Sequence, residues 1–375
     1  MGKYNFDEVI DRHGTDCLKY DFGMKRKGRD DLLPLWVADM DFRLPDEILD
    51  EFHKRIDHGI FGYTDPLDEY FDAMNHWFST RYGYTIKPEW VTLGAGIVYA
   101  LGTSVKAFTE EGDAMMVMQP VYYPFSEVIK NDGRKLVNCQ LRYENNRYSI
   151  DFEKMEQMIK EENVKALIFC NPHNPVGRVW TREEMEKVAE ICLKYNVIWM
   201  VDEMHCDFIF PGHEFTSCMN LDKKFHEIIA LYSSPGKTFN VAGLQPANII
   251  IPNEELRKKY QWANTQAAYS QGSLMGQLAV KVCYTKGADW VDELVEYIYE
   301  NVKYMSRYVK ENFPKAKMVE PEGTYLVWVD FSGYGFSNEE LEHLMLEEAK
   351  LWLDLESSLD QRQHSLSVST LRVHE

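Results

Sequence analysis

The sequence predicts an α/β protein with a mostly parallel central sheet covered by helices on both faces, together with a smaller α+β domain. Three observations lead to this prediction. Short apolar runs without polar alternation, typical of strands buried on both faces, recur through the middle of the chain. Amphipathic stretches separate these runs, as crossover helices separate parallel strands. A chain of 375 residues is long enough for a large core and a second lobe.

The expected elements alternate along the chain. A glycine turn followed by an apolar helix is expected over 92–108. A second helix is expected over 181–196, where Thr181 and Glu184 have the spacing of a capping box. Helical residues 287–313 and the strand-like 325–331 predict the smaller domain. The strand-like runs of the large sheet are 114–119, 164–172, 197–203, 228–234 and 247–252.

The chain is expected to divide into four segments. Residues 45–290 are assigned to the large, cofactor-binding domain, and 291–355 to the small C-terminal domain. Residues 1–44 are expected to be the N-terminal part of the small domain. Residues 356–375 form a tail that fits neither domain.

The composition disfavours several kinds of partner and compartment. With 41 basic and 60 acidic side chains, the formal net charge is −19, which argues against nucleic acid and anionic membranes as partners. The N-terminus lacks the apolar core of a signal peptide, and no later run is long enough to span a bilayer. The 7 cysteines are odd in number and scattered, as expected of buried thiols in a reducing compartment. We therefore predict a cytoplasmic protein.

Ligands of an open parallel sheet gather beyond the carboxyl ends of its strands, so the polar residues after each run are the candidates for a site. Lys237 follows the run 228–234, in SSPGKTFNVAG. Alone it would be an ordinary solvated charge. Here Ser234 offers a hydroxyl and Gly236 allows a tight turn, as anion-binding loops need. A buried lysine loses its proton readily and becomes an amine nucleophile for an aldehyde.

Asp202 ends the run 197–203. It could cap a helix, or bind a metal with Glu203, His205 and Cys206, but this spacing matches no common zinc pattern and no metal is expected. A carboxylate is also what pyridoxal 5′-phosphate (PLP) needs beside its pyridine nitrogen, so that the ring accepts the electrons of a carbanion. His205 would then reach the phenolic oxygen of the ring.

Three further segments contribute candidates. Asn174, in NPHNPVG, marks either an ordinary turn or an amide that binds the phenolic oxygen of PLP. Tyr122, in QPVYYPF, is either a core aromatic or a ring stacked on the cofactor. The helix expected after Gly96 would bind phosphate with its first N–H groups. The glycine spacing there does not match a dinucleotide fingerprint.

Together, NPHNPVG, VDEMH, SSPGKTFNVAGLQ and QPVYYPF resemble the fold-type I PLP-dependent enzymes of the class I/II aminotransferase superfamily. Residues 33–45 (LPLWVADMDFRLP) and 60–66 (IFGYTDP) resemble one branch more narrowly, the MalY/PatB-type cystathionine β-lyases, or cysteine-S-conjugate β-lyases. The similarity extends from about residue 3 to about residue 355. It implies the aspartate-aminotransferase fold, PLP as cofactor, a small amino-acid substrate and a homodimer.

The resemblance implies roles for matching positions. Lys237 resembles the lysine that forms the Schiff base with PLP and shuttles the Cα proton. Asp202 resembles the partner of the pyridine nitrogen, Asn174 and His205 the partners of the phenolic oxygen, and Tyr122 the stacking ring. The other matching positions are Gly96, Ile97, Val98 and Ser234 at the phosphate, Tyr63 reaching the neighbour's phosphate across the dimer interface, and Val37 and Ala38 lining the substrate carboxylate with their backbone.

The chain departs from the family at two places in the site. Gly236 stands where serine is common, which removes one phosphate hydroxyl, and Gln245 stands where aminotransferases often have arginine. We expect weaker binding of the phosphate for both reasons.

The largest departure lies after Leu355. The family ends with a strand of the pattern R-[IV]-N-x-A-x-P-R, whose arginine grips the substrate carboxylate. Residues 356–375 are instead polar, without a helix or strand period. One allowed back-translation of them, read one base out of frame, gives GVIFGPEAAQFERINIASPR, which contains the missing motif. We therefore hypothesise a frameshift, which would uncover apolar surface of the small domain. The alternative is a divergent tail in which Arg362 or Arg372 replaces the family arginine.

The function implied by the resemblance is a PLP-dependent carbon–sulfur β-lyase. Such an enzyme eliminates a thiol from L-cystathionine or another cysteine S-conjugate and leaves pyruvate and ammonia. A class I/II aminotransferase shares every cofactor residue and is the first alternative. The second is a protein that binds PLP but turns over poorly because of its altered tail.

Overall fold

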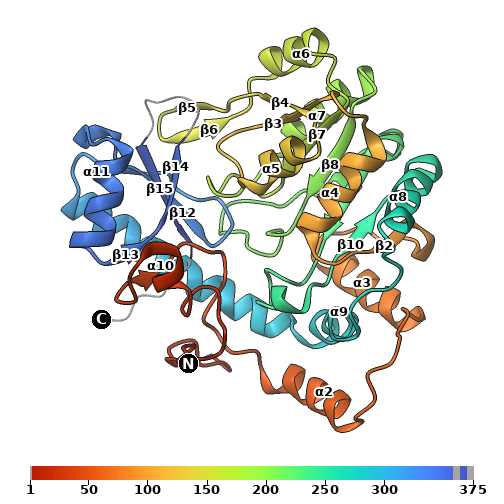
Figure 1. Cartoon of the computed structure of the whole chain (residues 1–375), viewed down its shortest axis with the longest axis horizontal. Helices are drawn as coiled ribbons and strands as arrows, with labels where there is room; N and C mark the ends of the chain where they lie inside the picture. Colours follow the sequence, from red (N-terminus) through yellow and green to blue (C-terminus); the bar gives the residue numbers. More distant parts are fainter. Residues whose placement is uncertain (1, 358–363, 370–375) are drawn as a thin grey trace.

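The computed structural model describes residues 2–357 and 364–369. A seven-stranded sheet lies toward one end of the molecule, and a four-stranded sheet with helix α11 lies toward the other (Figure 1). Helix α10 (Ala288–Asn312) joins the two, because it contacts both α9 and strand β11. This arrangement confirms the predicted fold class.

The seven-stranded sheet has the order β2-β10-β9-β8-β7-β3-β4. Strands β3, β4, β7, β8 and β9 are parallel, whereas β10 runs antiparallel to β2 and β9. Each strand-like run of the sequence contains one of its strands. The edge strands β2 and β4 were not predicted, because they lack a continuous buried run. The strands are β2 (Val91–Leu93), β3 (Ala114–Val117), β4 (Lys135–Asn138), β7 (Ala166–Cys170), β8 (Ile198–Asp202), β9 (Ile229–Ser233) and β10 (Asn248–Ile250).

Alternate side chains of the central strands enter two separate cores, which explains the helices on both faces. Leu167 and Phe169 of β7 belong to one core, and Ala166 and Ile168 belong to the other. The first core is covered by α2 (Asp46–Asp57), α3 (Asp68–Arg81), α6 (Phe152–Glu161), α7 (Arg182–Lys194) and α9 (Leu274–Lys286). The second is covered by α4 (Ile97–Phe108), α5 (Pro124–Asn131) and α8 (Glu254–Gln266).

Helix α7 begins as its sequence predicts. The Glu184 N–H donates to Thr181 Oγ1 over 3.2 Å, and the Thr181 N–H donates to Glu184 Oε2 over 2.9 Å. This reciprocal pair confirms the capping box, which satisfies two N–H groups that the first helical turn leaves free.

The four-stranded sheet has the order β11-β12-β15-β14 and is antiparallel throughout. Its strands are β11 (Lys317–Met318), β12 (Leu326–Asp330), β14 (Asp354–Ser357) and β15 (His364–Ser369), and α11 (Asn338–His343) lies beside them. The predicted strand over 325–331 is confirmed by β12.

The expectation that residues 356–375 contain no strand was wrong for β14 and β15. Strand β12 is buried along its whole length, so its backbone needs a partner on both edges, and β15 supplies the second one. Backbone pairing leaves no trace in side-chain periodicity, which is why the sequence did not predict it. Arg362 and Arg372 lie outside the described residues. The frameshift and the domain boundaries stay predictions.

The N-terminal segment packs beside the small sheet, where β1 (Leu33–Pro34) pairs in parallel with β13 (Leu351–Trp352). The remaining α-helix and strands of the described residues are α1 (Gly23–Lys27) and the hairpin of β5 (Arg142–Glu144) with β6 (Arg147–Ser149). Among the helices that the structure describes, we find none with the length and apolar character of a membrane span.

Candidate active site

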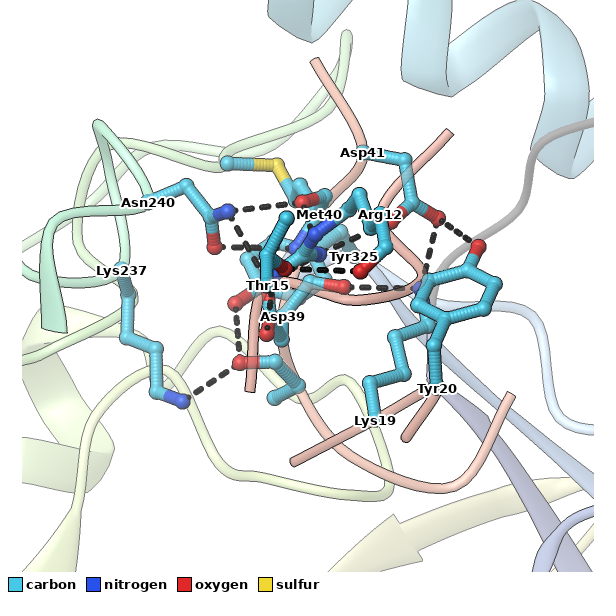
Figure 2. Close-up of polar contacts among 11 residues, drawn as sticks. Arg12, Thr15, Lys19, Tyr20, Asp39, Met40, Asp41, Lys237, Asn240 and Tyr325 are labelled. Carbon is cyan, nitrogen blue, oxygen red and sulfur yellow. Dashed lines mark hydrogen bonds and ion pairs between the residues drawn. The ribbon is translucent and has the colours of Figure 1, made fainter. Parts of the chain in front are cut away.

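Lys237 lies in the loop that follows β9, at the carboxyl edge of the seven-stranded sheet. Its Nζ donates a hydrogen bond of 2.7 Å to the Ala38 carbonyl, as Figure 2 shows. Burial lowers the pKa of the Lys237 amine, although Asp39 and Asp202 offset part of this effect. The amine therefore loses its proton more readily than an exposed lysine, as a nucleophile must.

A cavity of about 170 Å³ opens beside Lys237. It brings together most of the predicted site residues, from four separate strand ends and one helix start. The predicted residues that line it are Gly96, Ile97, Val98, Tyr122, Asn174, Asp202, His205, Ser234 and Lys237. Cys170, Met204, Gly236, Ala242, Gln245 and Pro246 complete the lining.

Val37 and Ala38 line an adjoining cavity of about 400 Å³, which shares Tyr122, Asn174 and Lys237 with the first. Lys237 thus faces both cavities. Tyr63 lines neither cavity. It lies in the loop between α2 and α3 and is 98% exposed.

Asp202 ends β8 and is buried. The Met204 N–H donates to its Oδ1 over 3.0 Å. No cation forms an ion pair with it within the described part of the chain. Burial raises the pKa of Asp202 to about 7, against opposing effects from the Met204 N–H and Lys237. A buried carboxyl group in this state is stabilised by any cationic nitrogen placed against it.

His205 and Asn174 lie beside each other in the cavity lining, with Asn174 Nδ2 3.5 Å from His205 Nε2. Burial, followed by the nearby Lys237, lowers the pKa of His205 to about 3, so the imidazole is neutral. Its Nδ1 is buried and has no hydrogen-bond partner among residues 2–357. An unpaired buried ring nitrogen is costly, and a polar ligand in the cavity would relieve that cost.

Glu203, a possible metal ligand by its sequence position, forms hydrogen bonds with the loop at Ser217 and Cys218. Its two carboxylate oxygens accept from the Ser217 hydroxyl (2.7 Å) and the Cys218 N–H (2.9 Å). Across the described ranges, no three His, Cys, Asp or Glu side chains gather in a group that could hold a metal ion.

Helix α4 begins at the cavity. Gly96 is its N-cap with φ of 83°, a left-handed conformation that favours glycine, and no side chain caps the helix. The N–H groups of Ile97 and Val98 have no acceptor within the helix, because they belong to its first turn. Such free N–H groups, with the helix dipole, bind phosphate.

Ser234 lies at the predicted place, but its hydroxyl is engaged in the loop. It donates to the Pro246 carbonyl over 2.7 Å and accepts from the Gly236 N–H over 3.0 Å. Its role at the phosphate stays a prediction. Tyr122 joins the ends of β3 and β7, since its N–H donates to the Asn174 carbonyl over 3.1 Å.

Sequence reasoning missed three residues near the lysine. The Tyr325 hydroxyl donates to the Ala38 carbonyl over 3.2 Å, and its ring lies 5.4 Å from that of His205. Asp39 and Asn240 bond to each other over 2.9 Å beside Lys237. Asn240 stands within the SSPGKTFNVAG motif and Asp39 within WVADMDF, but no pattern in either motif shows that they meet.

These residues fit PLP. The cavity contains an amine for its aldehyde and a buried carboxyl group without an ion pair for its pyridine nitrogen. It also contains polar groups for its phenolic oxygen and an uncapped helix N-terminus for its phosphate. The fold and the site therefore define a PLP-dependent enzyme. The model of the family described as aminotransferase class I and II matches residues 30–358, and the chain belongs to this family.

Relatives of known name share the fold and most of the length. The chain is 40% identical over 350 residues to cystathionine β-lyase PatB of Bacillus subtilis strain 168, covering 93% of this chain and 90% of PatB. The crystal structure of cystalysin from Treponema denticola, which contains PLP, superposes with a TM-score of 0.94 at 33% identity, covering 98% and 95% of the two chains. The PLP-bound C–S lyase of Staphylococcus hominis gives 0.87 at 31% identity, covering 98% and 93%.

Proposed function

We propose that this protein is a carbon–sulfur β-lyase that eliminates a thiol from L-cystathionine or another cysteine S-conjugate and leaves pyruvate and ammonia. The observation that carries the proposal is the Lys237 amine at the junction of two cavities, one lined by Asp202 and the other by Ala38. The similarity to PatB, whose name states this activity, supports the choice of reaction.

Bound in the smaller cavity, PLP supplies an electron-accepting ring for the charge that develops at the substrate Cα. Lys237 would hold the cofactor through its aldehyde carbon, and once the substrate amine has displaced it, the free Nζ would take the Cα proton. Asp202 would keep the pyridine nitrogen protonated, and the Asn174 amide and His205 would hold the phenolic oxygen. Tyr122 would cover the ring face.

The other predicted residues orient the two ends of the bound molecules. The N–H groups of Ile97 and Val98, which follow the Gly96 turn, would hold the phosphate, and Ser234 shapes the loop beside that place. The backbone of Val37 and Ala38 lines the place of the substrate carboxylate in the larger cavity.

We also propose a homodimer in which Tyr63 reaches the phosphate of the neighbouring subunit. Its support is an exposed apolar surface on the loop between α2 and α3, which a second subunit would cover. The exposed side chains there are Ile60 (65%), Phe61 (58%), Tyr63 (98%) and Leu67 (74%). A cytoplasmic location is proposed because all seven cysteines are free and buried.

Borohydride treatment of the PLP-loaded protein, followed by peptide mass mapping, tests the proposed lysine. We expect the mass of the reduced cofactor on the Lys237 peptide, and its absence from Lys237→Ala. Modification of a different lysine would contradict the proposal. This measurement does not depend on turnover, so it decides the cofactor site even if the tail impairs activity.

An aminotransferase is the second candidate, favoured by the match to a family of that name. Incubation with cystathionine, and separately with an amino-acid and keto-acid pair, separates the two activities. Thiol and pyruvate from cystathionine indicate the lyase, whereas a new amino acid indicates transamination. If both reactions are slow, grafting the family's arginine-bearing C-terminus in place of residues 356–375 should raise turnover. No increase would contradict the hypothesis that the tail limits activity.

A further inference from the structure

The segment 37–41, which carries the proposed carboxylate-lining backbone, is tied to the lysine loop by one side chain. Asn240 follows Lys237 by three residues, and its φ of 52° is left-handed. Its Oδ1 accepts from the Met40 N–H over 2.9 Å, and its Nδ2 donates to the Met40 carbonyl over 2.7 Å and to Asp39 Oδ1 over 2.9 Å. Figure 2 shows this amide pointing at the 39–40 backbone.

The chemistry of these three bonds requires a primary amide. Asn240 pairs with both backbone groups of Met40, as a neighbouring strand would, and still has an N–H left for the Asp39 carboxylate. A carboxylate in its place would only accept hydrogen bonds, and a hydroxyl would have a single hydrogen to donate. The pair of residues is separated by 200 positions in the sequence, so the amide joins two distant segments.

The far side of the same segment is held by ion pairs, in which Lys19 and Asp41 are buried and Arg12 and Asp39 are partly exposed. Arg12 donates to both oxygens of Asp39 (2.8 and 2.9 Å), to the Met40 carbonyl (3.1 Å) and to Asp41 (2.9 Å). Lys19, whose side chain is fully buried, donates to the Asp39 carbonyl (3.0 Å) and to Asp41 (2.7 Å). These contacts hold the segment in place from that side, and Asn240 connects it to the lysine loop.

These contacts fix the position of the Ala38 carbonyl. This carbonyl accepts from both Lys237 Nζ and the Tyr325 hydroxyl, and it directly precedes the two residues that Asn240 and Arg12 hold. A shift of the segment would move this acceptor away from the amine, and would move the carboxylate-lining backbone with it. Displacements of about 1 Å in such sites cost about 100-fold in rate.

We propose that Asn240 is a positioning residue that holds the 37–41 segment against the lysine loop. In this way it sets the position of the Lys237 amine relative to the backbone that lines the substrate carboxylate. The proposal rests on the proposed function, because it takes Lys237 as the lysine that binds PLP. It adds a residue whose role is geometric and which lines neither of the two cavities.

The test is the rate at which borohydride traps limiting PLP on Lys237 in the full chain. Asn240→Gly keeps the left-handed backbone without strain and removes only the side chain. We expect trapping to slow about tenfold or more, with kcat for cystathionine lowered and KM raised. The matched control is Asn196→Gly, at an exposed residue with φ of 55°, which should leave all three values unchanged.

A second variant keeps the test decisive if Asn240→Gly does not fold. Asn240→Asp retains the acceptor for the Met40 N–H but loses both N–H donors, and we expect the same slowing. Unchanged trapping, kcat and KM in a folded variant, with only a lower melting temperature, would overturn the proposal and leave Asn240 a structural residue. Trapping on another lysine in the unaltered chain would instead overturn the proposed function, so the two failures are distinguishable.

Discussion

Lys237 lies between the carboxyl edge of the seven-stranded sheet and the 37–41 segment, and these two regions differ in how far their polar groups are paired. At the sheet edge, His205 Nδ1 has no partner in the described chain, and Asp202 accepts a hydrogen bond from one backbone N–H. In the segment, the carbonyls of Ala38, Asp39 and Met40 all accept from side chains, namely those of Lys237, Lys19 and Asn240.

The sheet edge is therefore a binding surface, whereas the 37–41 segment is a support for the lysine. Unpaired buried groups cost free energy until a ligand pairs with them, so the sheet edge is stabilised by what binds there. The charged groups of the segment are paired without a ligand, because Arg12 and Lys19 form ion pairs with Asp39 and Asp41. Substitutions in each region test whether the two regions differ in this way.

The largest effect is expected from Asp41→Asn in the support. It leaves the fully buried Lys19 without its carboxylate, and removing one partner of a buried ion pair costs about 3–5 kcal/mol of unfolding free energy. Denaturant unfolding with and without PLP measures the loss, which should be the same in both states. The control is Asp31→Asn, in an exposed pair with Arg29, where we expect no measurable change. Equal losses in the two variants would contradict the role of the buried network.

Asp202→Asn is expected to act on turnover. The neutral amide cannot hold a proton on the pyridine nitrogen, so kcat should fall about 100- to 1000-fold relative to the unaltered chain. Steady-state assays with cystathionine measure the fall. A similar loss in Asn138→Asp, which lies on the edge strand β4, would indicate a general defect instead of a specific one.

The same substitution should stabilise the PLP-free protein, and more so at high pH. The carboxyl of Asp202 keeps its proton up to a pKa of about 7 when folded, against 3.8 when unfolded. Its contribution to stability is therefore present below about pH 4 and is lost as the pH rises toward 7. The gain from Asp202→Asn should be on the order of 1–3 kcal/mol larger at pH 8 than at pH 5. Unfolding curves at the two pH values measure the difference.

Asp41 should respond to pH in the opposite direction. Burial alone would raise its pKa, but Lys19, Arg12 and Tyr20 outweigh burial and lower it. Its contribution to stability is present at neutral pH and is lost only in acid, below its usual pKa. Unfolding curves of both proteins over a range of pH measure this. If the stability of Asp41→Asn equalled that of the unaltered chain near pH 8 and not in acid, the assignment would be refuted.

The smallest effect is expected from Gly236→Ser, which restores a hydroxyl beside the phosphate. A Cβ at this position would lie 3.1 Å from Ser234 Oγ, so that side chain must move by a few tenths of an ångström. One added hydrogen bond of about 1 kcal/mol should tighten PLP binding about fivefold. Titration of PLP into the cofactor-free protein measures the affinity, with Gly243→Ser, where a Cβ meets open space, as the control. Weaker binding would show that Ser234 cannot give way.

The central strands and the order of the candidate residues at their ends were predictable from the sequence. Strands buried on both faces need continuous apolar runs, so β3, β7, β8, β9 and β10 all left a readable pattern. Because parallel strands end at one edge, the positions of Asp202, Asn174 and Lys237 along the chain were enough to predict that they lie together.

Other features had no such signal. Edge strands such as β2 and β4 bury too little to show a run, and β15 is held by backbone pairing. The place of Val37 and Ala38 came from the family resemblance and not from a pattern of residues. The meeting of Asn240 with Met40 required the tertiary structure, because side-chain hydrogen bonds between distant segments have no period in the sequence.

The sequence alone was enough to predict the central strands, the two helical layers and the chemistry gathered at the sheet edge, since each depends on local apolar patterns and strand order. Which groups at that edge stay unpaired, and which segment supports the lysine from the other side, could be seen only in the folded structure. The reason is physical: burial and pairing depend on contacts between residues far apart in the chain, and these arise only when the chain has folded.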